Sequence, residues 1–226
     1  MIPRAIAMIC VFLPFIAVHT TLLIGIFVGN LEPCNPYWSS CHSISATGRQ
    51  YPEFFVFKAL LIPTAVLMSA YWLLLYQWVQ QVTEGAYKAK PLVLMGIIAS
   101  IALVIYTVTL GAEGNAYGLA RRIGVIFYFA FSAFAHLLLL GYVDKVDTHH
   151  LNIVTEQNRL SISATILIVT AIFSAIVGYV FPEFWDEWEN AYEWWFSLLM
   201  ISMFYQVGSM WKKTQFSLSL SISPHI

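Results

Sequence analysis

The sequence predicts an all-α membrane protein, a single-domain bundle of six transmembrane helices over residues 1–226. Hydrophobic residues make up 59% of the 226 residues and charged residues only 10%, whereas soluble domains carry about 25% charged residues. The apolar residues also fall into six segments. Each segment is close to the roughly 20 residues that a helix needs to cross a hydrocarbon core about 30 Å thick.

The six predicted spans use most of the chain and leave only short connections. We expect the first span to be retained, because it is long for a signal peptide and lacks a small-residue cleavage site at its end. Residues 30–53 form a polar outer loop, and residues 212–226 form a C-terminal tail, of which the stretch SLSLSISPHI is expected to be poorly ordered. The predicted spans are 5–29, 54–80, 91–110, 118–143, 160–181 and 190–211.

The distribution of Lys and Arg predicts that both termini are cytoplasmic, because cytoplasmic segments retain positive charge. With this orientation the inner segments hold Arg4, Lys88, Lys90, Lys145, Arg159, Lys212 and Lys213, and the outer segments hold Arg49, Arg121 and Arg122. Four acids, Glu183, Asp186, Glu187 and Glu189, crowd the last outer loop. The net charge of −1 gives no reason to expect a nucleic-acid partner.

Two cysteines, Cys34 and Cys41, lie in the predicted outer loop. An oxidising lumen or periplasm would permit a disulfide between them, and two free thiols are the alternative. A metal site that adds His42 is a weaker interpretation because one more ligand is missing. We therefore expect no metal centre, and no motif in the sequence predicts a cofactor.

Charged residues near the outer ends of four predicted spans form the candidate site. A ring of mixed charge at this depth can hold a phosphate headgroup while acyl chains lie between helices. The alternative is that these cations snorkel to the interface and that the nearby Trp and Tyr residues form an ordinary interfacial belt. The predicted headgroup-binding residues are Lys58, Glu113, Arg121, Arg122 and Arg49, and Glu193 lies about one turn into the last span.

Two histidines lie within spans. His136 follows Arg122 by about four helical turns, which places it on the same side of the fourth helix but in its inner half. His19 is nearer the middle or the outer half, so the two are not at the matching depth that a bis-histidine haem requires. His136 is therefore either a buried, hydrogen-bonded residue or a proton-transfer group.

Three stretches of the chain together resemble the Frag/DRAM/Sfk family of six-span membrane proteins, in the order found in that family. They are SISATGRQYPEFFVFKALLIPTAVLMSAYW, GNAYGLARRIGVIFYFAFSAFAHLLLLGYV and ENAYEWWFSLLMISMFYQVGSMW. The first resembles the family's Ser-rich outer loop and second span. The second resembles the fourth span with its late histidine, here His136, and the third resembles the last span with an acid before an aromatic residue, here Glu193 and Trp194. The likeness is strongest to the branch that remodels the lipid of GPI anchors in the Golgi lumen.

This resemblance implies lipid handling at the lumenal or outer leaflet of the Golgi, the ER or the plasma membrane. We expect a protein that binds or remodels a phospholipid, a lyso-lipid or a GPI-type lipid, by acyl transfer if it is an enzyme. Glu193 or His136 would then be the general base, and Glu193 is the better placed because His136 is too deep. The alternative is a non-enzymatic adaptor or regulator, linked to autophagy or to a phosphoinositide kinase, that recruits a protein partner through its cytoplasmic loops.

Overall fold

The computed structural model describes residues 2–217, and all regular structure in this range is helical, which confirms the predicted all-α class. The six long helices are α1 (Ile2–Val28), α3 (Glu53–Val82), α4 (Lys90–Thr109), α5 (Asn115–Val143), α6 (Val154–Val180) and α7 (Pro182–Lys213). Two short helices, α2 (Pro36–Ser39) and the 3₁₀ turn η1 (Ala46–Gly48), lie in the connection between α1 and α3.

Five of the long helices, α1 and α3 to α6, are long and apolar enough to cross a membrane, which is the composition of a multi-pass membrane protein. Helix α7 does not belong to this group because acids crowd its first half and because Trp, Tyr, Gln and Ser dilute the apolar residues of its second half. A sixth span therefore stays a prediction. Helix α7 also begins at Pro182, well before the predicted residue 190, since proline suits the first turn of a helix.

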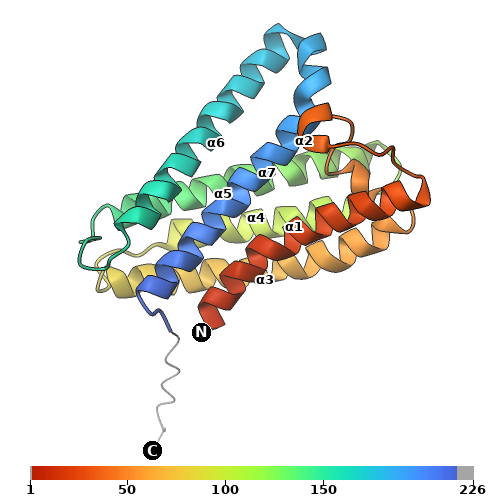
Figure 1. Cartoon of the computed structure of the whole chain (residues 1–226). Helices are drawn as coiled ribbons and strands as arrows, with labels where there is room; N and C mark the ends of the chain where they lie inside the picture. Colours follow the sequence, from red (N-terminus) through yellow and green to blue (C-terminus); the bar gives the residue numbers. More distant parts are fainter. Residues whose placement is uncertain (1, 218–226) are drawn as a thin grey trace, which may run out of the picture.

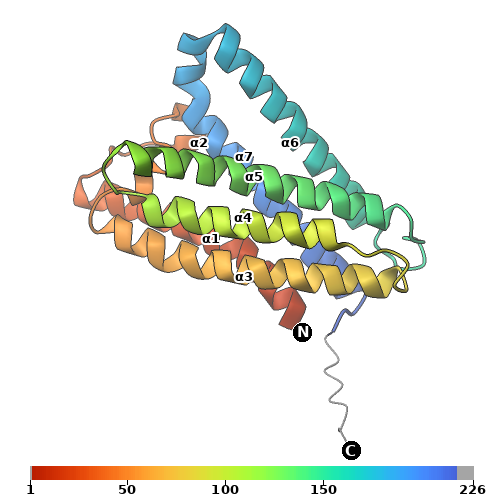
Figure 2. The same ribbon diagram turned by 180° about the vertical axis from the view of Figure 1, so that it is seen from behind.

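Successive long helices run in opposite directions, as Figures 1 and 2 show. The α1–α3, α4–α5 and α6–α7 connections gather at one end of the bundle, which we call the loop end. Both ends of the described chain lie at the opposite end, which we call the terminal end. The two ends of the described chain thus share one side of the bundle. That this side is cytoplasmic stays a prediction from the Lys and Arg distribution.

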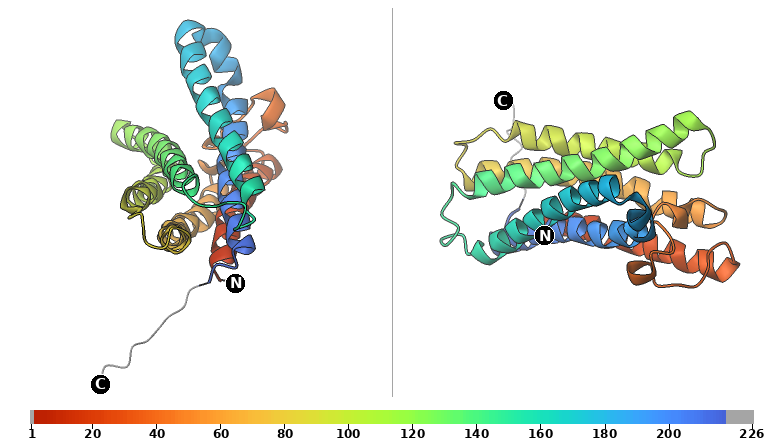
Figure 3. Two further views of the ribbon diagram at one scale, coloured as in Figure 1. Left: turned by 90° about the vertical axis from the view of Figure 1, so that its left-hand side faces the viewer. Right: turned by 90° about the horizontal axis from the view of Figure 1, so that it is seen from above.

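The long helices form a ring that is incomplete. Neighbours in space follow the order α5, α4, α3, α1, α7, α6, while α5 and α6, which would close the ring, touch little. The α6–α7 hairpin tilts away from α5 towards the loop end (Figure 3). Only 22% of the apolar window of α6 is buried, against 39–44% in the other four candidate spans. The ring therefore opens sideways between α5 and α6.

Small residues allow the closest helix contacts in the bundle. The backbone of Gly124 in α5 packs against α4 so closely that an added Cβ would lie 2.8 Å from Tyr106 N and 2.9 Å from Ala102 O. In α4, Gly96 leaves room for the indole of Trp72, one of the largest fully buried side chains. These contacts hold α3, α4 and α5 together as one side of the ring.

At the terminal end α7 is tied to its neighbours. Lys213 Nζ lies 2.7 Å from Glu156 Oε2 in the first turn of α6. Beyond the helix, Trp78 Nε1 donates to Thr214 Oγ1 (3.0 Å) and Phe216 is buried against Trp211. Residues 212–216 of the predicted tail thus pack on α3, α6 and α7. Residues 218–226, which make up nearly all of the stretch expected to be poorly ordered, lie outside the described range.

We expect Gly124→Ala to destabilise the protein, since its new methyl group would push α5 away from the α4 backbone at a cost of about 1–3 kcal/mol. The measurement is the apparent melting temperature of the detergent-purified variant. Gly141→Ala is the matched control on the same helix, where nothing lies within 4 Å of the added Cβ. Equal melting temperatures for the two variants would contradict the close α4–α5 packing.

Candidate functional site

The connection between α1 and α3 forms a docked cap at the loop end rather than a free loop. Cys34 and Cys41 are joined by a disulfide, with Cα atoms 6.6 Å apart, and enclose the short helix α2. Asn35 begins α2, and its side chain accepts a hydrogen bond from Tyr37 N (3.1 Å). The side chain of His42 lies close enough to both cysteines to complete a metal site. Bridged sulfurs offer no thiolate to a metal, so the structure favours the disulfide over the metal site.

Five hydrogen bonds hold this cap on α7. Glu193 Oε2 accepts one of them from Ile44 N (3.3 Å). In the other four, Asn190 Nδ2 donates to Ser40 O (2.9 Å), Ala191 N to Ser40 Oγ (3.2 Å), Trp194 Nε1 to His42 O (2.8 Å) and Trp195 Nε1 to Tyr37 O (3.0 Å). The first loop of the chain is thereby fixed to its last long helix.

A groove of about 1240 Å³ occupies the gap between α5, α6 and α7 beneath the cap. Most of its wall is apolar, with Phe134 and Leu137 on the α5 side and Leu167 and Ile172 on the α6 side. We call it the lateral groove, because α5 and α6 diverge there (Figure 3). Two of the candidate membrane spans, α5 and α6, therefore flank it.

The loop-end part of the lateral groove is polar and carries charges of both signs. Arg49 comes from the cap, and its Nη2 donates to Ser45 Oγ (2.7 Å). Arg121 and Arg122 come from the second turn of α5. Glu189 and Glu193 come from α7, together with Asn190. Of the predicted site residues, the structure thus brings Arg49, Arg121, Arg122 and Glu193 together.

The structure does not bring Lys58 or Glu113 into this groove. Lys58 lies on α3, which the intervening α4 separates from the groove. Its Nζ instead donates to Val108 O near the end of α4 (2.9 Å) and lies 3.8 Å from the centroid of the Phe54 ring. A cation is favourable there because carbonyl groups at a helix C-terminus carry partial negative charge. Glu113 is exposed in the α4–α5 connection.

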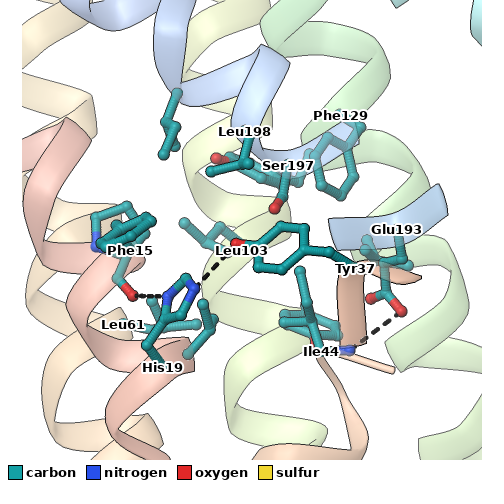
Figure 4. Close-up of a pocket in the computed structure, with 16 residues that line it drawn as sticks. Phe15, His19, Tyr37, Ile44, Leu61, Leu103, Phe129, Glu193, Ser197 and Leu198 are labelled. Atoms are coloured by element: carbon teal, nitrogen blue, oxygen red, sulfur yellow. Dashed lines mark hydrogen bonds between the residues drawn. The ribbon is translucent and has the colours of Figure 1, made fainter. Parts of the chain in front are cut away.

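A smaller cavity of about 70 Å³ lies beneath the cap and adjoins the lateral groove (Figure 4). Its polar lining includes His19, Tyr37 and Ser197, while Glu193 and Tyr106 line both spaces. His19 Nδ1 donates to Phe15 O (2.7 Å), so Nε2 of the neutral ring accepts from Tyr37 Oη (2.9 Å). Burial raises the pKa of the Tyr37 phenol, which keeps this proton in place.

His136 lies in the core and lines neither space. Its ring is fully buried, Nδ1 donates to Ser132 O (2.8 Å), and Nε2 therefore accepts from Tyr71 Oη of α3 (3.1 Å). Trp72 and Phe204 pack edge-on against the ring. Both nitrogens have partners, as expected for a structural histidine that links α3 to α5. This environment leaves Glu193 as the sequence-predicted general base that faces the groove.

Several groove residues were missed in the sequence analysis. Ser43, Ser45 and Asn190 carry no signal of their own, because serine and asparagine are common in loops and at helix starts. Glu189 could have been found, because it lies four residues before Glu193 and such residues share one face of a helix. A prediction of helix rather than loop for this acidic segment would have placed Glu189 and Glu193 on one face.

Searches against protein-family models, curated proteins and solved structures find no match to this chain. The resemblance to the Frag/DRAM/Sfk family therefore stays a prediction from the three sequence stretches.

Removing the disulfide with the double change Cys34→Ser and Cys41→Ser should lower stability by about 2 kcal/mol, because the open loop gains conformational freedom when the protein unfolds. The apparent melting temperature of non-reduced protein measures this effect. Cys10→Ser is unsuitable as a control because Cys10 is buried, so the wild type under a reducing agent serves instead. A double variant as stable as the oxidised wild type would argue against a bridged cap.

Tyr71→Phe should cost about 1–3 kcal/mol, because it leaves the buried Nε2 of His136 without a donor. The melting temperature should fall, although neither residue lines the lateral groove. Tyr76→Phe on the same helix is the control, since its hydroxyl forms no hydrogen bond with the described residues. A Tyr71→Phe variant as stable as the wild type would contradict this buried hydrogen bond.

Proposed function

We propose that this protein binds a phospholipid-type lipid in the lateral groove. The headgroup lies at the loop end against Arg49, Arg121 and Arg122, and an acyl chain lies along the α5–α6 wall. One observation carries the proposal: the lateral groove is apolar along most of its wall and holds three arginines, beside two glutamates, at one end. An amphipathic ligand that already lies in the bilayer matches this distribution.

The guanidinium groups suit a phosphate better than other cations would. Arginine keeps its charge and presents paired N–H donors that match phosphate oxygens. The three arginines come from two separate elements, the cap and α5. A phosphate between them would therefore bridge the cap to α5.

The apolar wall suits an acyl chain. Each CH₂ group that leaves water contributes about 0.8 kcal/mol, but a chain that moves from bilayer to groove gains little from this effect. The headgroup contacts must therefore supply most of the preference for one lipid over another. The wall admits the chain and positions it along α5 and α6.

Lipid remodelling by acyl transfer is a narrower form of this proposal. Glu193 supports it, because its carboxylate lines both the groove and the adjoining cavity. The resemblance to the GPI-anchor branch also favours remodelling in the Golgi or ER, and a bridged cap fits an oxidising compartment such as a lumen or the cell exterior. The proposal of binding does not depend on catalysis.

Arg122→Ala should weaken lipid binding roughly tenfold, the effect of losing a hydrogen bond to a charged group. Native mass spectrometry of the detergent-purified protein, with added phospholipids of matched chains, measures the bound fraction. The control is Arg159→Ala, which removes an exposed arginine at the terminal end of α6. Ala171→Trp, which fills the apolar wall, should also reduce binding.

Equal lipid binding by all three variants and the wild type would refute the proposal. The adaptor alternative predicts this result, together with loss of cellular activity when the terminal-end connections 83–89 or 144–153 are altered. Both connections lie at the terminal end of the bundle, opposite the polar end of the groove.

A further inference from the structure

The polar end of the lateral groove holds two separated sets of opposite charge. The positive set is Arg49, Arg121 and Arg122, from the cap and α5, and the negative set is Glu189 and Glu193, from α7. Throughout residues 2–217, no N–O distance of 4.0 Å or less joins an arginine to a carboxylate. The groove therefore presents both charges to a ligand.

The surrounding structure keeps the two sets apart. Glu193 is half-buried and its Oε2 accepts from Ile44 N, while the guanidinium of Arg49 is directed to Ser45 Oγ. Arg121 and Arg122 belong to α5, from which the α6–α7 hairpin diverges at the loop end. Opposite charges that form no ion pair with each other can both be compensated by a ligand that carries both signs.

Aromatic rings lie on the same side as the carboxylates. Trp185 and Tyr192 line the groove with Glu189, and their ring centroids are 5.1 Å apart in an edge-to-face arrangement. Trp185, Glu189 and Glu193 follow one another at four-residue spacing, which places them on one face of α7. The electron-rich faces of Trp and Tyr attract ammonium groups, including quaternary ones.

These observations lead us to propose that the ligand is a zwitterionic phospholipid, of the phosphoethanolamine or phosphocholine class. This inference rests on the proposed lipid-binding function and specifies its headgroup. The phosphate binds the arginines, and the ammonium group, linked to it by an ethylene bridge, lies between Glu189, Glu193 and the two aromatic rings. An anionic lipid would match the arginines but place no cation against the carboxylates.

The test compares phosphatidylethanolamine, phosphatidylcholine, phosphatidylglycerol and phosphatidic acid with identical acyl chains, each added to the purified full-length protein and followed by native mass spectrometry. The wild type should favour the two amine-containing lipids by about threefold or more over phosphatidylglycerol, a difference typical of one exposed ion pair. Glu189→Gln should remove most of this preference by weakening only the amine-containing lipids. Glu187→Gln, an exposed acid on α7 that does not line the groove, should keep it.

The possible failures are distinguishable. If phosphatidylglycerol or phosphatidic acid binds at least as well as the amine-containing lipids, and Arg122→Ala still weakens binding, the headgroup assignment is wrong and the lipid site stands. If neither headgroup nor Arg122→Ala affects binding, the proposed function itself fails. Because the preference of the wild type decides between these results, the test does not depend on the stability of the Glu189→Gln variant.

Discussion

The docking of the first loop on α7 is the contact on which the rest of the site depends. It joins elements about 150 residues apart in the sequence through five hydrogen bonds, several of them from Trp and Asn side chains to backbone carbonyls. The same contact covers the small cavity, directs Arg49 over the groove and fixes the carboxylate of Glu193. Without it, α7 would still pack on α1 and α6, but no polar roof would lie over the gap beside α5.

Much of the fold could be predicted from the sequence, because membrane helices must satisfy their own backbone hydrogen bonds and therefore appear as long apolar segments. The start of α7 could not be predicted, because its acidic first turns have the composition of a loop between spans. The position of residues along the bundle axis could also be predicted from the sequence. Arg121, Arg122 and Glu193 lie at the same end as Lys58 and Glu113. The order of the helices around the bundle could not be predicted, because hydropathy does not indicate which helices are neighbours. Lys58 therefore lies at the expected depth but on the far side of α4 from the groove.

The two histidines illustrate the same limit. Both were recognised as unusual within spans, and both use one nitrogen for the carbonyl four residues earlier and the other for a tyrosine hydroxyl. Yet His136 is enclosed by the core, whereas His19 faces a cavity beside Glu193. The difference comes from the partner tyrosine, which belongs to a buried helix in one case and to the disulfide-closed cap in the other. Sequence spacing contains no information about that choice.

The sideways opening between α5 and α6 determines which concentration of ligand would control its binding. A ligand that enters from the bilayer is supplied by diffusion in two dimensions, and its abundance is its mole fraction in one leaflet rather than its solubility in water. Under the proposed function, lipids would surround the opening at all times, and its occupancy would be an exchange between one lipid and another. A lipid preference of even a few fold would then be visible against the bulk composition of the leaflet, and the bound lipid would change whenever that composition changes.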